Sequence, residues 1–459
     1  MNTFSIRNLK PNASVHMIGI GGISMSALAH ILRYFGYHVT GSDANVSDLT
    51  KKLEENGIPV AIGQSADNIK SPDLVCYTAA IAEDDAELVK ARSLGIPVLE
   101  RAELLGQIMT LYQFPIAVAG THGKTTTTSM LSLVLLEAAV DPTILVGGVL
   151  PQIDGNLRIG SKEYLVCEAC EYVESFLHFH PYLSIITNVE ADHMDYFRDL
   201  SHIISSFEKF TSLNDPAGHI IVNSDDANAM KTVKNAQCKI TYYGINDKNA
   251  DFFAKNVQLD ENGHPKFDIY FQKEIYLSVH LQVTGEHNIY NSLAVCAAAA
   301  SLGVEKEAIK RGLETFGGTK RRFEKIGEYN GTTIIDDYAH HPTEIRATLN
   351  TAREMPFQKV WCVFQPHTYS RTQAFLDDFA QALQLADRLI VADIYPAREK
   401  YDGSIHACDL AAQIPNAVYM NDFGAIERYI RQNVQPGDAV ITMGAGNVCQ
   451  IAYALAGRI

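Results

Sequence analysis

The chain has 459 residues, of which 47% are hydrophobic and 20% charged. This balance is typical of a soluble globular protein and excludes global disorder, and at roughly 150 residues per domain the length predicts three domains. The 38 basic and 53 acidic residues give a formal net charge of −15, so the surface would repel a phosphate backbone and no nucleic acid is expected as a partner.

Several further features concern the cellular compartment. The longest apolar stretches, at 131–140 and 293–304, are too short or too interrupted for the roughly 20 helical residues that cross a bilayer. Residues 1–11 carry charges and an Asn where a secretory signal would be apolar. The eight cysteines are scattered over a long chain, which is typical of a reducing compartment. We therefore predict a cytoplasmic protein without membrane insertion.

Short β-rich runs alternate with amphipathic stretches along nearly the whole chain, which predicts an α/β protein with mostly parallel sheets. We expect an N-terminal Rossmann-like domain over 1–111 and a central P-loop ATPase-like domain over 112–316, with an added β hairpin at 270–283. A C-terminal doubly wound Rossmann-like domain is expected over 317–459. The boundaries follow from a restart of the strand–turn–helix pattern and from the Gly317–Gly318 pair, which we interpret as a hinge.

The first domain opens with a predicted strand at 15–20, a glycine turn, a helix at 24–35 and a second strand at 37–40. The turn reads Gly-Ile-Gly-Gly-Ile-Ser, and an acidic residue follows at about the offset of a ribose-binding acid. Because serine stands where a dinucleotide fold has its third glycine, we favour another nucleoside diphosphate over a nicotinamide dinucleotide, with packing alone as the remaining interpretation. The predicted binding residues are Gly19, Gly21, Gly22, Ser24 and Asp43.

The second domain begins with an apolar strand at 114–119, followed by Gly-Thr-His-Gly-Lys-Thr-Thr and an apolar helix at 125–139. This is the context of a phosphate-binding loop, because glycines let backbone N–H groups surround an anion and the helix N-terminus adds partial positive charge. Val118 stands where the standard pattern has glycine, so the loop is a shortened variant; the alternative is a tight turn with a helix cap. The predicted nucleotide-binding residues are Gly120, Thr121, His122, Gly123, Lys124, Thr125 and Thr126.

Acidic and imidazole groups follow two later strands of this domain. The carboxyl ends of parallel strands share one edge of a sheet, so Glu168 and the run Glu190–Asp195 are expected beside the phosphate loop. Mg2+ prefers hard oxygen ligands and is shared with substrate phosphates, which suits Thr125 and Glu168. His193 is a less typical ligand of Mg2+, and a helix-capping or hydrogen-bonded role is the alternative.

The third domain alternates strands with helices and carries polar runs at predicted strand ends or turns, at 320–324, 336–344 and 365–371. Its arginines have the planar donors that bind phosphate or carboxylate bidentately, its tyrosine suits stacking on an aromatic base, and its histidines suit a hydrogen bond to a substrate. For each residue alone a solvated or capping role is an equal alternative. The candidates are Arg322, Tyr338, His340, His341 and Arg371.

Together, these motifs resemble those of the Mur ligases of peptidoglycan synthesis. The matching segments are the glycine turn at 19–24, the loop at 120–126, Asn-Val-Glu-Ala-Asp-His-Met-Asp at 188–195, Gly-Glu-His-Asn at 285–288 and Asp-Asp-Tyr-Ala-His-His-Pro-Thr-Glu at 336–344. They occur in the family's order and in all three predicted domains.

The resemblance implies an ATP-dependent ligase that joins L-alanine to the lactyl carboxylate of UDP-N-acetylmuramic acid through an acyl phosphate, releasing ADP and phosphate. The first domain would hold the UDP end, the central domain would hold ATP and Mg2+, and the third would close over both and bring the amino acid. The expected cofactors are therefore ATP and Mg2+, and the expected partners are the two substrates. The chain is expected as a monomer or homodimer.

Family roles carried over by position complete the predicted site. The resemblance implies that the Mg2+ between the β- and γ-phosphates is bound by Thr125 and Glu168, and that a second Mg2+ is bound by His193. The implied ATP-site residues outside the loop are Asn288, Arg322 and Tyr338. The implied catalytic residues, which would touch phosphates, metal or the muramyl substrate, are Lys124, Glu168, His193, His341 and Arg371.

Some positions depart from the family pattern, and other interpretations stay open. Cys170 stands where the family often has Asp, and Thr368 stands where arginine is common. Lys209 and Glu208 both lie near the position of the lysine that holds the second metal in several relatives, and the choice between them stays open. The sister ligase that recycles murein tripeptide and the folylpolyglutamate synthases share the phosphate loop, although the synthases lack the first domain. A nicotinamide-dependent oxidoreductase and a catalytically idle nucleotide-binding regulator are the alternatives from other classes.

Overall fold

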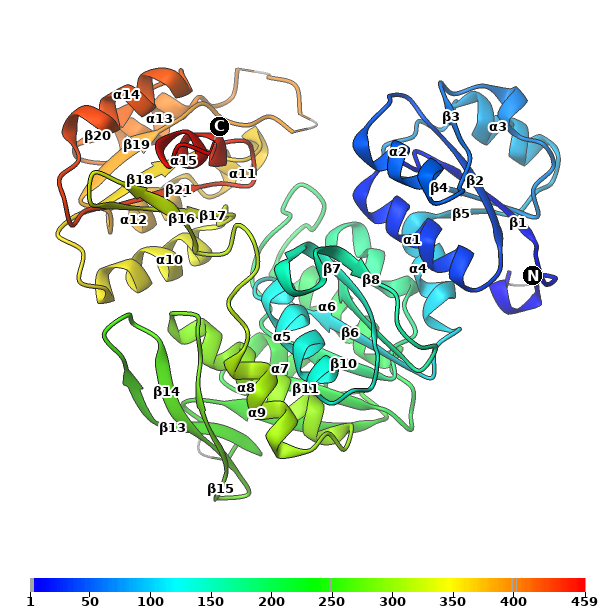
Figure 1. Cartoon of the computed structure of the whole chain (residues 1–459), viewed down its shortest axis with the longest axis horizontal. Coiled ribbons are helices and arrows are strands. Elements are labelled where there is room, and N and C mark those ends of the chain that lie inside the picture. The colour runs from blue at the N-terminus through cyan, green and yellow to red at the C-terminus, as the bar shows by residue number, and fades with distance from the viewer. Residues whose placement is uncertain (1–3, 248, 398, 402, 459) are drawn as a thin grey trace.

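The structure is a computed structural model that describes residues 4–247, 249–397, 399–401 and 403–458. Within these residues the chain forms three α/β domains, each built around one sheet (Figure 1). This confirms the predicted fold class with its three sheet-containing domains, whereas the residue bounds of the domains stay predictions.

The first domain has a five-stranded parallel sheet in the order β3-β2-β1-β4-β5. The first strand ends at Ile18, earlier than predicted, because Gly19 has a positive φ of 77° and begins the glycine turn. The strands are β1 (Ser14–Ile18), β2 (His38–Asp43), β3 (Val60–Ile62), β4 (Leu74–Tyr77) and β5 (Val98–Glu100). The helices are α1 (Ile23–Tyr34), α2 (Asp48–Glu55), α3 (Ala86–Ser93) and α4 (Arg101–Met109), with the short 3-10 helices η1 (Ile6–Asn8) and η2 (Ala66–Asn68).

The central domain has a ten-stranded sheet in the order β15-β14-β13-β12-β11-β10-β6-β9-β7-β8. Its middle strands are parallel, whereas the pairs β7–β8, β13–β14 and β14–β15 are antiparallel. The strands are β6 (Phe114–Ala119), β7 (Thr143–Leu150), β8 (Gly155–Arg158), β9 (Tyr164–Ala169), β10 (Leu183–Ile186), β11 (His219–Asn223), β12 (Lys239–Gly244), β13 (Phe252–Leu259), β14 (Pro265–Phe271) and β15 (Glu274–His280). The helices are α5 (Lys124–Glu137), α6 (Leu200–Ser212), α7 (Ala227–Thr232), α8 (Glu286–Ser301) and α9 (Lys306–Glu314), with η3 (Pro151–Ile153) and η4 (Tyr172–His178).

The added β hairpin exists but is displaced from the predicted range 270–283. It is formed by β14 and β15, which turn at Gln272 and Lys273, and β13 adds a third antiparallel strand. Both turn residues have positive φ, 49° and 73°, although neither is glycine or asparagine. The predicted range was displaced because the residues that normally mark such a turn are absent from it.

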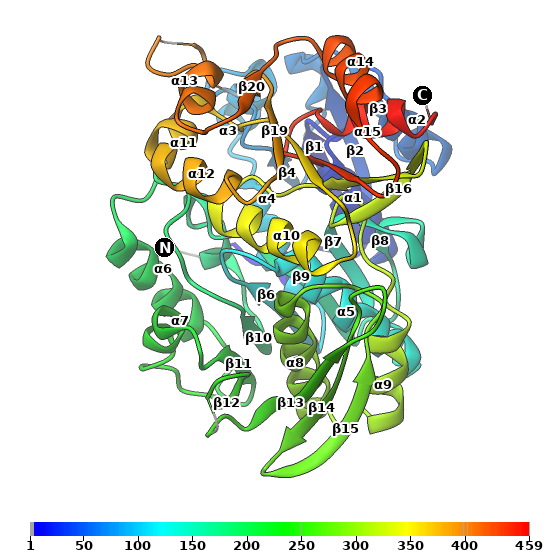
Figure 2. The same ribbon diagram turned by 90° about the vertical axis from the view of Figure 1, so that its left-hand side faces the viewer.

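The third domain has a six-stranded sheet in the order β16-β17-β21-β18-β19-β20, in which β16 and β17 are antiparallel and the other neighbouring strands are parallel. The strands are β16 (Glu324–Tyr329), β17 (Thr332–Asp337), β18 (Val360–Phe364), β19 (Arg388–Val391), β20 (Ala417–Tyr419) and β21 (Ala439–Met443). The helices are α10 (Pro342–Glu354), α11 (Tyr369–Ala374), α12 (Leu376–Leu383), α13 (Ala407–Ala412), α14 (Phe423–Asn433) and α15 (Cys449–Leu455). Figure 2 shows α10 between this sheet and the central domain.

One hydrophobic cluster continues from the first domain into the central domain. Leu105 and Ile108 of α4 belong to the same buried cluster as Phe176 of η4 and Phe207 and Phe210 of α6. The rings of Phe176 and Phe210 stack with their centroids 4.7 Å apart. Burial of these large side chains ties the two domains together, because each removes apolar surface from water.

We expect Gly106→Ala to weaken this junction, because a Cβ at position 106 would lie 1.9 Å from the backbone oxygen of His178. Overpacking of this kind costs about 1–3 kcal/mol, so the urea midpoint of unfolding should fall. Gly155→Ala is the matched control, since a Cβ there meets no atom within 4 Å. Equal midpoints for the two variants would contradict the tight contact.

Among the described residues, every helix falls short of the length and apolar character that a bilayer span requires.

Candidate active site

The phosphate loop lies at the middle of the central sheet, where β6 runs between β10 and β9. Gly120 and Gly123 have φ values of 140° and 82°. A Cβ at Gly120 would lie 1.9 Å from the Thr187 hydroxyl oxygen, and one at Gly123 would lie 2.8 Å from Asn291 Oδ1. Only glycine combines a positive φ with the absence of a Cβ, and both positions require this. The N-terminus of α5 faces the loop with its free N–H groups, as an anion site requires.

Lys124 folds back over this loop onto a carboxylate. Its Nζ lies 2.9 Å and 3.1 Å from the two carboxylate oxygens of Glu171, and it also donates to the backbone oxygens of Gly120 and Thr121. Both side chains are largely buried. Burial alone would lower the pKa of Lys124, but the Glu171 charge outweighs it and raises the pKa, so the ammonium stays charged. No role was predicted for Glu171 from the sequence, although it lies two residues after the end of the strand that carries Glu168.

Thr125 and Glu168 meet as predicted. The Thr125 hydroxyl donates to Glu168 Oε2 at 3.1 Å, and the Gly147 N–H donates to Glu168 Oε1 at 2.6 Å. Glu168 reaches the loop because β9 is the parallel neighbour of β6, so both strands end at the same edge. A hydroxyl and a carboxylate oxygen are the hard donors that suit Mg2+.

His193 belongs to a different contact group from these two residues. Its ring lies against the Tyr172 ring with centroids 4.6 Å apart, and its Nε2 is 3.8 Å from Asp192 Oδ2. Its φ of 53° is in the left-handed region, which turns the chain after Asp192. The predicted metal ligands therefore divide between the Thr125–Glu168 pair and the His193 turn.

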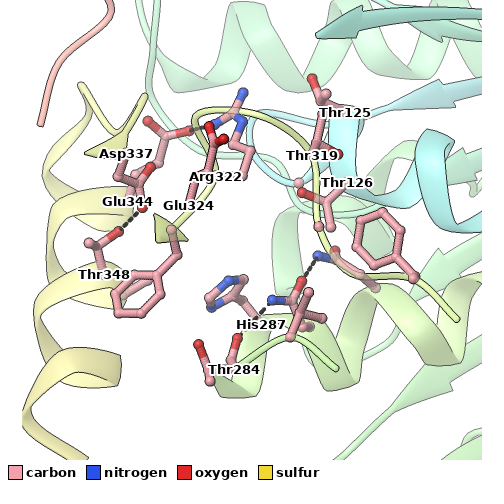
Figure 3. A pocket seen from close by; sticks show the side chains of 18 of the residues that line it. Thr125, Thr126, Thr284, His287, Thr319, Arg322, Glu324, Asp337, Glu344 and Thr348 are labelled. Carbon is pink, nitrogen blue, oxygen red and sulfur yellow. Dashed lines mark hydrogen bonds and ion pairs between the residues drawn. The ribbon is translucent and has the colours of Figure 1, made fainter. Parts of the chain in front are cut away.

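A cavity of about 760 Å³ lies between the central and third domains, a size that accommodates a nucleotide. Figure 3 shows Thr125 and Thr126 on one side, Arg322, Asp337 and Glu344 on another, and His287 below. Of the residues predicted to bind ATP, those that line the cavity are His122, Gly123, Thr125, Thr126, Asn288 and Arg322. Those outside its lining are Gly120, Thr121, Lys124 and Tyr338.

Tyr338 packs against two arginines instead of facing the cavity. Its ring centroid is 4.9 Å from the Arg321 guanidinium carbon and 5.2 Å from that of Arg322. Such cation–π contacts satisfy the ring within the third domain. Its stacking on an aromatic base stays a prediction.

Two cavity residues with shifted pKa values were not assigned from the sequence. Burial and the Arg322 charge lower the pKa of His287 to about 4, so its imidazole is neutral. Burial raises the pKa of Asp337 to about 6, although Arg322 and a 2.7 Å hydrogen bond from Thr348 oppose the shift. Both lie inside motifs that carried the family resemblance, and this was the signal that could have found them.

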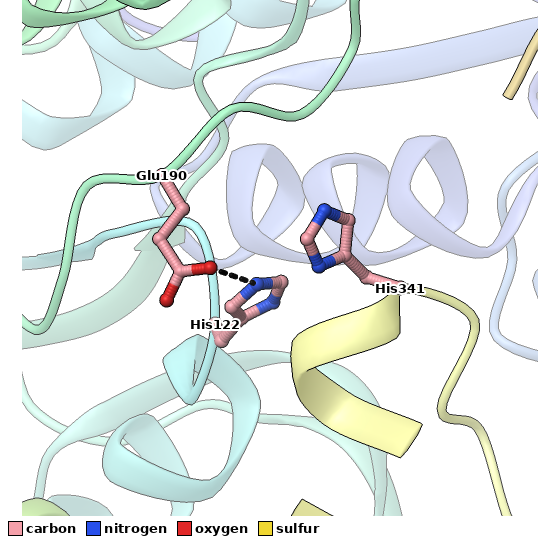
Figure 4. Close-up of side chains that lie close together, drawn as sticks. All are labelled: His122, Glu190 and His341. Atoms are coloured by element: carbon pink, nitrogen blue, oxygen red, sulfur yellow. Dashed lines mark ion pairs between the residues drawn. The ribbon is translucent and has the colours of Figure 1, made fainter. Parts of the chain in front are cut away.

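The central and third domains meet at His122 of the phosphate loop (Figure 4). Its Nδ1 is 3.3 Å from Glu344 of α10, and its Nε2 is 3.8 Å from Glu190, a distance of ionic contact. The His122 and His341 rings lie 4.7 Å apart, and His341 Nε2 is 3.0 Å from the backbone oxygen of Ala191. Burial would lower the pKa of His122, but Glu190 and Glu344 raise it to about 9. The loop therefore carries a cation clamped by one carboxylate from each domain.

Arg371 forms a second link between these domains. Its Nη2 and Nε donate to Asp192 Oδ1 at 3.0 Å and 3.3 Å; Asp192 is buried and the Arg371 side chain is largely so. His341 and Arg371 were predicted to approach the muramyl substrate, and here both contact the segment that follows β10. Their contact with substrate stays a prediction.

The glycine turn of the first domain is assembled as predicted. The Gly21 N–H donates to Asp43 Oδ2 at 2.9 Å, and Gly22 is the N-cap of α1, whose first turn contains Ser24. A Cβ at Gly21 would lie 2.8 Å from Asp43 Oδ2, so glycine is required there. Gly19, Gly21, Gly22, Ser24 and Asp43 thus lie in one turn and the adjoining strand end, and their role in binding UDP stays a prediction.

The ion pairs of His122 with Glu190 and Glu344 predict a stability that depends on pH. The folded-state pKa of about 9 exceeds the ordinary value of 6.5, so the stabilisation is complete below pH 6.5 and is lost as the pH rises through 9. At pH 6.5 we expect the wild type to have a higher melting temperature than His122→Gln. By pH 9.5 most of this difference should be lost, which corresponds to a decrease of up to about 3 kcal/mol in the free energy of unfolding. A difference in melting temperature that does not change over this pH range would contradict these ion pairs.

Comparisons with known proteins agree with this architecture. Family models described as "Mur ligase family, catalytic domain", "Mur ligase middle domain" and "Mur ligase, glutamate ligase domain" match residues 14–113, 118–299 and 321–446. UDP-N-acetylmuramate--L-alanine ligase of Acetivibrio thermocellus is 50% identical over 98% of this chain and 97% of that protein. The ligase of the same name from Alkaliphilus metalliredigens is 49% identical over 96% of each chain.

Solved structures show the same relationship. The UDP-N-acetylmuramate-alanine ligase MurC of Thermotoga maritima superposes with a TM-score of 0.79 at 30% identity, covering 97% of this chain and 99% of that one. A murein peptide ligase of Psychrobacter arcticus gives a TM-score of 0.72 at 27% identity, with the same coverage. Relatives at half identity over nearly the full length, together with three successive family domains, show that the chain belongs to the Mur ligase family.

Proposed function

We propose that this enzyme joins L-alanine to the lactyl carboxylate of UDP-N-acetylmuramic acid in the cytoplasmic synthesis of peptidoglycan precursors, with ATP as the phosphoryl donor. The observation that carries the proposal is the 50% identity over 98% of the chain to a ligase of that name. The cavity supports it, because it lies between the phosphate loop and a third-domain wall that includes Lys320 and Arg322, and it can bring a triphosphate to an acid.

The chemistry follows from the poor reactivity of a carboxylate with an amine. The lactyl carboxylate attacks the γ-phosphorus of ATP, which breaks the bond to the β-phosphate oxygen and gives an acyl phosphate and ADP. The amine of L-alanine then adds to the acyl carbon, and loss of phosphate and a proton leaves the amide. Domain closure excludes water that would hydrolyse the acyl phosphate.

We assign the triphosphate to the loop, with the Lys124 ammonium on the outer phosphates and Arg322 and Asn288 on the rest of the nucleotide. We assign Mg2+ to Thr125 and Glu168, with a second Mg2+ at His193; the metal would neutralise phosphate charge when bound. The assignment of the first Mg2+ rests on the hydroxyl–carboxylate pair.

The remaining predicted roles extend the proposal to the other domains. His341 and Arg371 would approach the muramyl carboxylate, and the glycine turn with Asp43 would hold the UDP end. Residues 1–111 would then bind the UDP substrate, 112–316 ATP, and 317–459 the amino acid. We propose a monomer or homodimer.

Phosphate release from ATP tests this proposal. With Mg2+ present, release should require both UDP-N-acetylmuramic acid and an amino acid, and L-alanine should be faster than glycine or L-serine. Faster release with murein tripeptide would indicate the recycling ligase instead. NAD(H) turnover would indicate an oxidoreductase, and ATP binding without any release would indicate an idle regulator.

A further inference from the structure

Two imidazoles and one carboxylate converge at the turn between β13 and β14, on the antiparallel extension of the central sheet. Asp260 Oδ2 lies 3.0 Å from His280 Nε2 and 3.4 Å from His264 Nδ1. One ligand atom of each residue lies within 4.8 Å of the other two. The three side chains are between about a quarter and two-fifths exposed, so an ion from solvent can reach them.

The sheet register brings these residues together. Asp260 follows the last residue of β13, His264 precedes the first residue of β14, and Leu259 pairs with Pro265 across the turn. His280 is the last residue of β15 and pairs with the second residue of β14. Two antiparallel ladders therefore fix His280 itself and the residues that flank the turn with Asp260 and His264.

The Asp260 carboxylate is held in one orientation. Its Oδ1 accepts the backbone N–H groups of Asn262 at 2.8 Å and His264 at 2.9 Å, which leaves Oδ2 facing both imidazoles. The turn thus presents one oriented carboxylate oxygen to two imidazole nitrogens.

We propose that Asp260, His264 and His280 form a Zn2+ site. Ligand atoms of a tetrahedral zinc shell lie about 3.3–3.4 Å apart, and the two distances from Asp260 Oδ2 are 3.0 Å and 3.4 Å. Zn2+ binds imidazole nitrogen and carboxylate oxygen, whereas Mg2+ and Ca2+ prefer oxygen ligands alone. Water would complete the shell. The competing explanation is that both imidazoles simply hydrogen-bond to the shared carboxylate oxygen.

Zinc at this position would brace one wall of the interdomain cavity. His264 and its neighbours Glu261 and Asn262 line that cavity, and a Cβ at Gly263 would lie 3.5 Å from Met355 and 3.6 Å from Thr284. The ion would link the turn to β15 and so hold this wall against the third domain. Any effect on nucleotide binding rests on the proposed function, whereas the metal site itself does not.

Cobalt titration of the tag-free, metal-stripped full chain tests the site. Co2+ reports tetrahedral coordination by its visible absorption, and saturating Mg2+ keeps the oxygen sites occupied. We expect one equivalent to bind the wild type and Zn2+ to displace it. Asp260→Asn keeps the Oδ1 acceptor for the turn and His280→Gln changes a partly exposed side chain, so both should fold; each should lower Co2+ affinity by more than about 10-fold.

The matched control removes an imidazole from the second group of possible ligands, His122, Glu190 and His341. His341→Gln should leave the cobalt band unchanged. A band lost in His341→Gln but kept in His280→Gln would move the metal to the domain junction and overturn the proposal. A wild type without a band would leave only the hydrogen-bonded cluster. Because the titration contains neither ATP nor muramyl substrate, its failure is distinct from a failure of the proposed function.

Discussion

Lys124→Met is expected to lower kcat/KM for phosphate release by about 1,000-fold. The Lys124 ammonium is the positive charge that we assign to the outer phosphates, and it is held in the loop by two backbone oxygens and by Glu171. Removal of one preorganised donor from developing transition-state charge costs about 10²–10³-fold, and here a full positive charge disappears with it. The steady-state phosphate-release assay measures the effect, and a variant within about tenfold of wild type would contradict the assigned role.

Lys124→Met is also expected to lower the stability of the fold, so a control must separate this effect from the loss of catalysis. Glu171 is only 2% exposed, so Lys124→Met leaves its carboxylate buried without its cation. Breaking a buried pair in this way destabilises a protein by about 3–5 kcal/mol. In Lys124→Met/Glu171→Gln both charges are removed, and we expect the melting temperature to recover while activity stays lost. Recovery of activity in the double variant would show that the single variant failed through its fold.

The parts of the site that depend on neighbouring strands could be predicted from the sequence. Parallel strands end at one edge, so a carboxylate at the end of β9 had to lie beside the loop after β6, and Thr125 and Glu168 are in hydrogen-bond contact. The glycine loop could equally be predicted from the sequence, because Gly120 and Gly123 mark backbone conformations that other residues avoid.

Contacts between domains could not be predicted in this way. His122 and Glu344 are 222 positions apart, and their 3.3 Å contact depends on how the third domain packs on the second. No local periodicity encodes such a pairing, and this is also why Arg371 was expected at substrate and not on Asp192. Similarly, Tyr338 was assigned from its chemistry alone, whereas its position depends on Arg321 and Arg322 of the same domain.

The Arg371–Asp192 link should be the strongest single contact between the central and third domains. Asp192 is 6% exposed; burial would raise its pKa, but the His193 and Arg371 charges lower it, so the carboxylate is ionised. Arg371→Met would leave this buried charge without the guanidinium that donates twice to Asp192 Oδ1, and we expect a loss of about 3–5 kcal/mol at the domain junction. A lower melting temperature and a larger radius of gyration by small-angle X-ray scattering would measure it.

A second variant shows whether the missing charge is the cause. Asp192→Asn/Arg371→Met removes both ions, so the desolvation penalty disappears along with the attraction, and most of the lost stability and compactness should return. If Arg371 served only as a substrate contact, the single variant would keep the wild-type melting temperature and radius of gyration and lose activity alone. The radius of gyration of the double variant could instead stay as large as that of the single variant. The unpaired Asp192 charge could not then be the cause, because the double variant lacks it, and packing around the Arg371 side chain would hold the domains together.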